Sequence, residues 1–251
     1  MSVIRLTEVF RQAATSRIVR AAHQINQGAL PSLPGPGVAS DFYMLPVEEP
    51  EEIAQTVVDL VMTRLPRKFE VDPLRDIQVL CPMNRGGVGA RSLNIELQKA
   101  LNPAGERKVE RFGWTFAPGD KVMQIENDYD KDVYNGDIGM IEDVDLEEGE
   151  VAVNFDGRTV TFVFGELDTL VPAYAATIHK SQGSEYPAVV IPVMTQHYAM
   201  LQRNLIYTGV TRGKKLVVLV GQTRAVAIAV KNVSGRQRWS KLDEWLREPT
   251  H

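Results

Sequence analysis

The spacing of apolar residues changes twice along this 251-residue chain, and that change limits the folds open to it. Before about residue 107 and after about residue 172, apolar positions recur at helical spacing or form short continuous runs. Between these parts, apolar and polar residues alternate over short segments separated by turn-forming residues. The sequence therefore predicts an α/β fold into which a small β-module is inserted.

The flanking parts contain three apolar runs typical of buried parallel strands, Ile77–Cys81, Ala188–Val193 and Leu216–Val220. A further short strand is expected at Asp41–Pro46. Helices are expected at Glu8–Asn26, Pro50–Arg64, Ser92–Leu101, Ala199–Val210, Arg224–Asn232 and Ser240–Glu248. Strands that alternate with helices form a parallel sheet covered on both faces, and such sheets bind ligands beyond the carboxyl ends of their strands. We thus expect functional residues to follow runs such as Ile77–Cys81.

The middle part carries turn signals that separate short strands, such as Asn135-Gly136-Asp137 and Asp156-Gly157. The strands are expected at Lys121–Ile125, Ile138–Val144, Val151–Phe155 and Thr159–Phe164. Short strands at this spacing favour a small barrel. We predict that residues 107–171 form this barrel and that residues 1–106 and 172–251 form one discontinuous lobe.

Charge is distributed unevenly over these parts. Residues 111–172 contain 4 Lys/Arg against 15 Asp/Glu, a balance of −11, so the remainder of a chain of net charge −4 carries +7. The basic part suits a nucleic-acid partner, from which the acidic module would be held away. The acidic turns have an alternative interpretation, in which they only keep a small β-module soluble.

The composition also indicates where in the cell the protein is located. No apolar run approaches the roughly 18 residues that span a bilayer, and the first residues contain no apolar core of a signal peptide. The single cysteine, Cys81, excludes an internal disulfide and a cysteine-rich zinc site. We expect a cytoplasmic protein without a membrane segment.

The densest chemistry lies in Tyr174–Glu185, which combines hydroxyl, imidazole, ammonium, amide and carboxylate groups with Gly183. Hydroxyl, imidazole and ammonium groups are good phosphate donors, and a glycine lets the backbone approach a ligand closely. The alternative is a polar loop in which Thr177 or Ser181 caps a helix.

A second cationic segment, Asn204–Lys215, places Arg212 at a predicted helix end, directly before a predicted strand. A cation is favourable there simply because of the helix dipole. A planar guanidinium at this position also suits the γ-phosphate of a nucleotide. The residues alone leave both interpretations open.

Taken together, Ala176–Glu185 and Leu205–Lys215 closely resemble motifs V and VI of superfamily 1 helicases. Within that group they are similar to the RecD family, the α subunit of exodeoxyribonuclease V and its stand-alone relatives. Leu6–Gln12 resembles motif IV, and Cys81–Gly89 resembles a loop near the DNA track of that family. The resemblance implies a RecA-like lobe of the P-loop NTPase type.

The β-module also resembles this family, because Phe116–Met123 and Tyr134–Gly139 are similar to the SH3-like barrel inserted in its second motor lobe. The phosphate-binding pattern G-x-x-x-x-G-K-[ST] occurs nowhere in the chain. We therefore expect a C-terminal piece of a longer helicase, whose missing N-terminal motor lobe would supply the phosphate loop and the magnesium ligands. No cofactor is assigned to the piece alone, which is expected to hydrolyse no ATP and to bind single-stranded DNA weakly.

The resemblance implies roles for individual residues. Two arginines would act catalytically at the γ-phosphate of ATP bound with Mg²⁺, Arg11 and Arg212. The nucleotide-binding residues would be Phe10, Gln182, Gly183 and Glu185. The contacts to single-stranded DNA would come from Thr177, His179, Lys180, Asn84 and Arg85. The family moves 5′ to 3′ along DNA, and other exonuclease or recombination subunits are candidate partners.

Two other functions remain open at this point. The chain could be a non-catalytic protein- or DNA-binding module whose acidic barrel binds a basic partner. It could also be the helicase lobe of a conjugative relaxase-helicase, which shares motifs V and VI. A dinucleotide-binding enzyme is disfavoured because no G-x-G-x-x-G follows a predicted strand.

Overall fold

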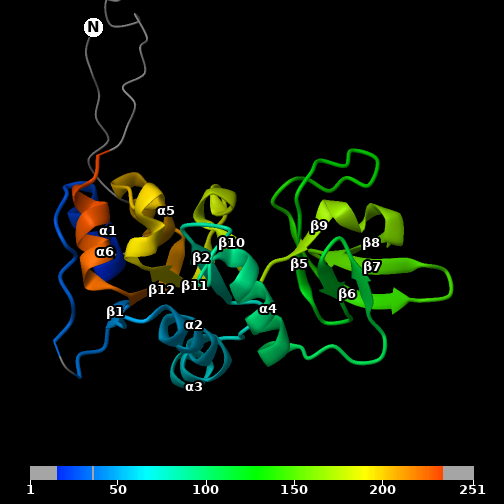
Figure 1. The fold of residues 1–251 in the computed structure, drawn as a ribbon, viewed down its shortest axis with the longest axis horizontal. Coiled ribbons are helices and arrows are strands. Elements are labelled where there is room, and N and C mark those ends of the chain that lie inside the picture. The colour runs from blue at the N-terminus through cyan, green and yellow to red at the C-terminus, as the bar shows by residue number, and fades with distance from the viewer. Residues whose placement is uncertain (1–15, 36, 234–251) are drawn as a thin grey trace, which may run out of the picture.

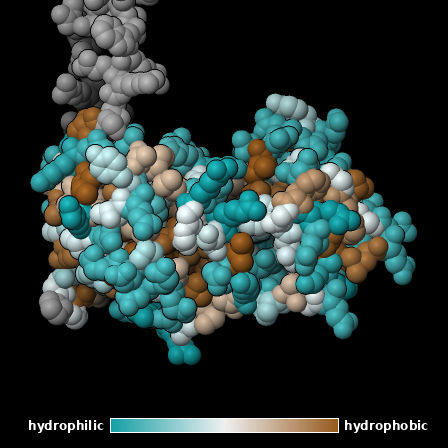
Figure 2. Space-filling view, viewed as in Figure 1, coloured by the Kyte–Doolittle hydropathy of each residue, from teal (hydrophilic) through white to brown (hydrophobic). Residues whose placement is uncertain are grey.

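The structure is a computed structural model, and it describes residues 16–35 and 37–233. Figure 1 shows two bodies side by side: a lobe built of helices around a parallel sheet, and a smaller β-barrel to its right. Both present a mainly hydrophilic surface on the face shown in Figure 2. Within the described ranges, no helix combines the length and the apolar character needed to cross a membrane.

The sheet of the lobe has five strands, all parallel, in the order β1-β12-β11-β2-β10. Its strands are β1 (Phe42–Pro46), β2 (Ile77–Cys81), β10 (Ala175–Thr177), β11 (Tyr186–Val193) and β12 (Gly213–Gly221). Successive side chains of β11 point to opposite faces and both faces are covered, which is why the strand is an unbroken apolar run. The four strands predicted outside the middle part are confirmed.

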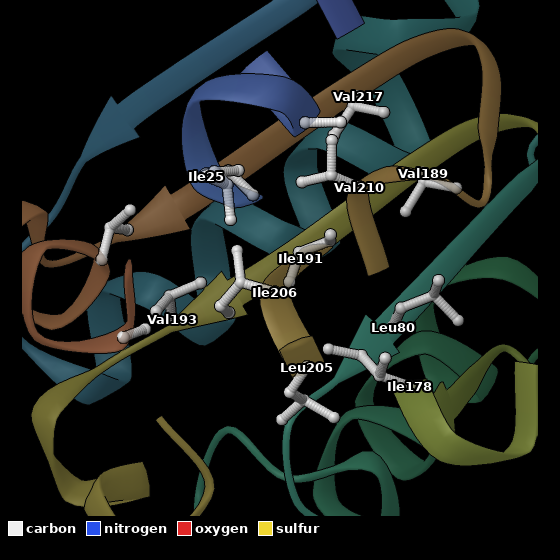
Figure 3. Close-up of a cluster of buried hydrophobic side chains, with 14 of the residues drawn as sticks. Ile25, Leu80, Ile178, Val189, Ile191, Val193, Leu205, Ile206, Val210 and Val217 are labelled. Atoms are coloured by element: carbon white, nitrogen blue, oxygen red, sulfur yellow. The ribbon is translucent and has the colours of Figure 1, made fainter. Parts of the chain in front are cut away.

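Helices cover both faces of the sheet. Helices α1 (Arg17–Asn26), α5 (Arg203–Val210) and α6 (Thr223–Lys231) pack on one face. Helices α2 (Pro50–Asp59), α3 (Leu65–Phe69) and α4 (Ala90–Leu101) pack on the other. Figure 3 shows the first of these cores, where side chains of α1 and α5 meet those of β2, β11 and β12.

Two helix predictions need correction. The helix expected at Pro50–Arg64 continues to Phe69, because a π-helical turn at Leu60–Arg64 joins α2 to α3. The helix expected at Ala199–Val210 begins only at Arg203, since Thr195–Met200 forms a 3₁₀ turn. Of the predicted N-terminal helix, the structure describes only the part from Ser16 onward, and the predicted helix Ser240–Glu248 lies outside the described residues.

The barrel is an antiparallel sheet in the order β8-β7-β6-β5-β9 with a separate hairpin, β3-β4, and it has its own apolar core. Its strands are β3 (Val109–Arg111), β4 (Trp114–Phe116), β5 (Lys121–Gln124), β6 (Ile138–Asp145), β7 (Glu150–Phe155), β8 (Arg158–Val163) and β9 (Leu170–Pro172). The four β segments predicted here are confirmed to within one residue at each end. The three short strands β3, β4 and β9 were not predicted.

The barrel is joined to the lobe by a buried carboxylate. Asp120 is fully buried and accepts hydrogen bonds from the Gln98, Asn102 and Tyr174 side chains at 2.6–2.7 Å and from the Ala117 N–H at 2.8 Å. Burial raises the pKa of Asp120, and these four donors oppose that rise. The network links α4 and the start of β10 to the first strands of the barrel.

A buried lysine makes a second link at the same junction. Lys121 donates from Nζ to the Ile77 carbonyl at the start of β2, at 3.3 Å. Burial lowers the pKa of Lys121 to about 8, while the carboxylates of Asp72 and Asp76 act in the opposite direction. Barrel and lobe are therefore joined by buried polar contacts as well as by the chain itself.

Candidate functional site

The two cationic segments of the sequence meet at the start of two neighbouring strands. β11 and β12 are paired in parallel, with Tyr186 opposite Gly213, and the Tyr186 N–H donates to the Arg212 carbonyl at 2.8 Å. This pairing brings Ser184 and Glu185, which precede β11, beside Arg212, which precedes β12. Segments that resemble motifs V and VI thus share one site.

The Arg212 guanidinium bridges these two segments. It donates from Nη1 to the Ser184 carbonyl at 3.0 Å, from Nε to the Thr208 carbonyl at 3.2 Å and from Nη2 to the Thr211 hydroxyl at 3.3 Å. The contact with Thr208 satisfies a carbonyl in the last turn of α5, as the helix-dipole interpretation expects. The contact with Ser184 reaches the other segment, where a carbonyl oxygen occupies the acceptor position that a phosphate oxygen could take.

Other predicted nucleotide-binding residues lie in the segment that leads to β11. Glu185 forms an ion pair with Lys214 at 3.2 Å, a partner that the sequence did not predict. Gly183 has a φ of +93°, a left-handed conformation that favours glycine, and the space where a Cβ would lie is open. Gln182 is exposed. Phe10 and Arg11 lie outside the described residues.

A tightly packed core holds the two segments together. Ile178, from the 3₁₀ turn η3 (Ile178–Ser181), packs in the same apolar core as α5 and β11, and Figure 3 shows it beside Leu80 of β2 and Leu205 of α5. Gly209 permits this approach, since a Cβ there would lie 3.0 Å from Ile191 Cδ1 and 3.2 Å from Ile178 Cδ1. The relative position of the two motifs is therefore fixed by side-chain packing.

The predicted DNA-binding residues lie at the carboxyl ends of β2 and β10. These strands are neighbours, with Thr177 opposite Cys81, so the residues that follow them leave the sheet at the same edge. Asn84, Arg85, His179 and Lys180 are exposed there, and Thr177 is half-buried. Partial burial lowers the pKa of Lys180.

A compact loop presents Asn84 and Arg85. Gly89 lies against this loop so closely that a Cβ would be 2.5 Å from the Arg85 carbonyl oxygen. The Arg91 N–H donates to the Asn84 carbonyl at 3.0 Å, which ties the loop to the first turn of α4. The backbone conformation of the loop thus depends on a glycine at position 89.

The predicted residues therefore form two groups at opposite ends of the strands. The DNA candidates follow β2 and β10, as expected, whereas Glu185 and Arg212 precede β11 and β12. The reason is that the chain runs back along the sheet twice, through η3 before β11 begins and through α5 before β12 begins. The short segment from Thr177 to Glu185 connects the two groups.

Amide side chains support strand β10, which leads into this segment, and sequence reasoning missed them. Asn94 of α4 donates to the Ala175 carbonyl at 2.7 Å and accepts from the Ala175 N–H at 2.8 Å, so it replaces a neighbouring strand along the edge of β10. Gln78 of β2 donates to the Tyr174 carbonyl at 3.2 Å.

Among residues 16–35 and 37–233, no three His, Cys, Asp or Glu side chains are grouped so that they could hold a metal ion.

Comparison with known proteins identifies the family. A model of the SH3 domain of ATP-dependent RecD-like DNA helicases matches residues 93–155, and a model of the UvrD-like helicase C-terminal domain matches residues 172–220. The ATP-dependent RecD2 DNA helicase of Deinococcus radiodurans is 36% identical over 235 residues, covering 94% of this chain and 30% of that protein. The chain belongs to the RecD-like helicases.

A second relative of this RecD-like chain is the RecBCD enzyme subunit RecD of Mycolicibacterium smegmatis, 34% identical over 163 residues. That match covers 65% of the chain and 28% of the subunit, so the chain spans less than a third of either relative. The alternatives of a non-catalytic module or a relaxase-type lobe are not favoured by these matches.

The fold of the RecD-like chain is similar to that of a solved helicase. The crystal structure of the Bacteroides Pif1 helicase in complex with ADP-AlF3 and ssDNA matches 86% of this chain and 51% of that chain, with a TM-score of 0.51 and 18% identity. At this identity the likeness concerns the fold alone. The expected RecA-like parallel-sheet lobe with an inserted SH3-like barrel is confirmed.

Proposed function

We propose that this chain is the second motor lobe of an ATP-dependent DNA helicase that moves 5′ to 3′ along single-stranded DNA. The observation that carries the proposal is the contact between Arg212 and the Ser184 carbonyl, which joins the motif V and motif VI segments at one site. The RecD-like family of the chain supports the same activity. A companion lobe with a phosphate-binding loop would complete the motor.

On the nucleotide side, Arg212 acts on the γ-phosphate by exchanging its carbonyl acceptor for phosphate oxygens. Arginines in this role stabilise the charge of the transition state and accelerate phosphoryl transfer by about 10³–10⁵-fold. Gln182, Gly183 and Glu185 border the nucleotide. The roles of Phe10 beside the base and of Arg11 beside the γ-phosphate are supported by the sequence resemblance alone. The magnesium ion that accompanies ATP would be held by the companion lobe.

On the DNA side, Thr177, His179, Lys180, Asn84 and Arg85 contact the sugar-phosphate backbone. Four of them are exposed at one edge of the sheet and Thr177 is half-buried there, and their donor groups support this role. Backbone contacts carry no sequence information, which is what a motor that moves along any strand requires.

The segment from Thr177 to Glu185 couples the two sides. One end borders the DNA candidates, and the other touches Arg212 through Ser184. A change in the position of Arg212 during hydrolysis would therefore move the backbone that precedes β11, and with it η3. Packing of Ile178 against α5 makes η3 and α5 move together.

Three further proposals follow from the same assignment. The domain boundaries are residues 107–171 for the barrel and residues 1–106 with 172–251 for the lobe. The partners are single-stranded DNA, the companion lobe and, as further candidates, exonuclease or recombination subunits, since one relative is a subunit of the RecBCD enzyme. The location is the cytoplasm, with Cys81 as a buried free thiol.

The DNA side is tested in the parent protein that carries both lobes. We expect His179→Ala and Lys180→Ala to reduce the DNA-stimulated ATPase rate more than the basal rate, because only the stimulated rate needs DNA contacts. Lys231→Ala, which removes an exposed lysine at the end of α6, is the matched control and leaves both rates unchanged. Equal loss of both rates in the His179 and Lys180 variants would contradict the assignment.

A further inference from the structure

The tip of the β3-β4 hairpin holds a phenylalanine in an unfavourable backbone conformation. Arg111 pairs with Trp114, so the hairpin loop consists of Phe112 and Gly113 alone. Their φ values are +52° and +77°. Positive φ at both central positions defines a type I′ turn, which favours Asn, Asp or Gly at the first position. A bulky side chain there is a genuine exception.

The barrel contains a second turn of the same kind with the preferred residue. Phe155 pairs with Arg158 across the two-residue loop Asp156-Gly157, whose φ values are +49° and +90°. Asp tolerates the left-handed conformation because its short polar side chain can hydrogen-bond locally. Phe112 has no such local compensation, so its presence needs another explanation.

Intramolecular packing does not supply that explanation. The Phe112 side chain is 54% exposed and is not a member of the apolar core of the barrel. The fold therefore keeps a strained, largely exposed aromatic residue at a position where Asn would be more favourable. Strained residues of this kind are found where a side chain contacts a ligand.

The neighbourhood of Phe112 alternates arginine and aromatic side chains. The Arg91 guanidinium lies 5.0 Å from the centroid of the Trp114 ring, and the Arg111 guanidinium lies 5.6 Å from that of Phe164. A Cβ on Gly113 would be 3.1 Å from Arg91 Nη2, so Arg91 also lies against the hairpin loop. Aromatic rings interleaved with arginines are typical of surfaces that bind single-stranded nucleic acid.

This surface is continuous with the DNA face proposed above. Arg91 is in the first turn of α4, and its N–H binds the carbonyl of Asn84, one of the proposed DNA contacts. A strand that leaves Asn84 and Arg85 would next meet Arg91, then Trp114 and the hairpin tip. Arg111 itself donates from Nη1 to the Glu110 carbonyl at 3.0 Å, and the other cations in the acidic module are buried or held by neighbouring groups: Lys121, Lys131 and Arg158.

We propose that Phe112 stacks on a base of single-stranded DNA, and that Arg91 and Arg111 bind the adjacent phosphates. The site extends the DNA face from the sheet edge to the β3-β4 hairpin of the barrel. The proposal rests on the proposed function, because it needs single-stranded DNA to bind at Asn84 and Arg85.

The test compares Phe112→Asn with the unchanged chain in two measurements. Thermal unfolding should show a Tm higher by about 2–4 °C, because Asn relieves the strain in the turn. Fluorescence anisotropy with a labelled oligothymidine should show binding weakened by about fivefold or more, the usual effect of losing one base–aromatic stack. A purely structural residue would not raise Tm and lower affinity together.

Asp156→Asn is the matched control, since it changes the same position of the other type I′ turn, and it should leave oligothymidine binding unchanged. Unchanged affinity in Phe112→Asn, with binding still lost in Lys180→Ala, would overturn the stacking site while the DNA face stands. Absence of oligothymidine binding by the unchanged chain would overturn both.

Discussion

Burial of His197 makes the stability of the fold depend on pH. The residue is 3% exposed, its Nδ1 has no hydrogen-bond partner, and desolvation lowers the pKa of His197 from 6.5 to about 4. Between these pH values the unfolded chain binds more protons than the folded chain. Stability is therefore retained above pH 6.5 and falls as the pH drops toward 4, by about 3 kcal/mol in total.

Urea unfolding at pH 7 and pH 5 measures this loss. We expect His197→Gln to reduce the difference between the two pH values, because the variant has no group to protonate. His23→Gln, at an exposed position of α1, should keep the full difference. An unaltered pH dependence in His197→Gln would show that other groups cause it.

The close packing of Gly89 is a second feature of a single residue that affects the stability of the fold. We expect Gly89→Ala to reduce the free energy of unfolding by about 1–3 kcal/mol, because the added Cβ would clash with the Arg85 backbone. Gly87→Ala changes the same loop where no atom lies within 4 Å of the added Cβ, and it should cost less than about 0.5 kcal/mol. Equal effects in urea unfolding would contradict the close approach.

At the scale of elements, the link between α4, β10 and the barrel depends on Asp120. We expect Asp120→Asn to reduce the free energy of unfolding by about 1–3 kcal/mol, since an amide cannot accept all four hydrogen bonds and turns a donor toward other donors. Tyr174→Phe removes one of the four and should cost less. Denaturant unfolding of the two variants provides the comparison, and a smaller loss for Asp120→Asn would refute this view of the junction.

The elements that the sequence predicted are those whose pattern is local. β2, β11 and β12 are buried on both faces and appear as continuous apolar runs, and the barrel strands β5–β8 alternate between recognisable turns. Strand β10 has three residues and is held by Asn94, which is 81 positions away in the chain. No local periodicity can reveal a strand that depends on such a distant partner.

The residues of the candidate site could be predicted from the sequence, but their tertiary contacts could not. The residue types of Tyr174–Glu185 and Asn204–Lys215 indicated phosphate chemistry, and the family resemblance joined the two segments. The resemblance also assigned candidate residues to DNA and to the nucleotide, but their positions at opposite ends of the strands followed only from the path of η3 and α5 back along the sheet. The ion pair of Glu185 with Lys214 and the support by Asn94 also depend on tertiary contacts that composition does not show.

At the scale of the whole molecule, lobe and barrel together supply one side of the proposed motor. The chain contains the arginine side of the proposed nucleotide site but no phosphate-binding pattern. We therefore expect the purified chain to show no ATP turnover above background in a phosphate-release assay, with or without oligothymidine. Robust turnover by the chain alone would contradict the proposal that a companion lobe must supply the phosphate-binding loop.

The most direct test of the central claim is the steady-state ATPase of the parent two-lobe protein carrying Arg212→Lys, which retains the charge but loses the planar fork. We predict that kcat falls by about 10³-fold while ATP affinity changes little, because the arginine acts on the transition state. Lys215→Ala, at an exposed lysine of β12, should leave kcat unchanged. If Arg212→Lys kept the parent kcat, or lost ATP affinity with kcat intact, Arg212 would not be the catalytic arginine of this site.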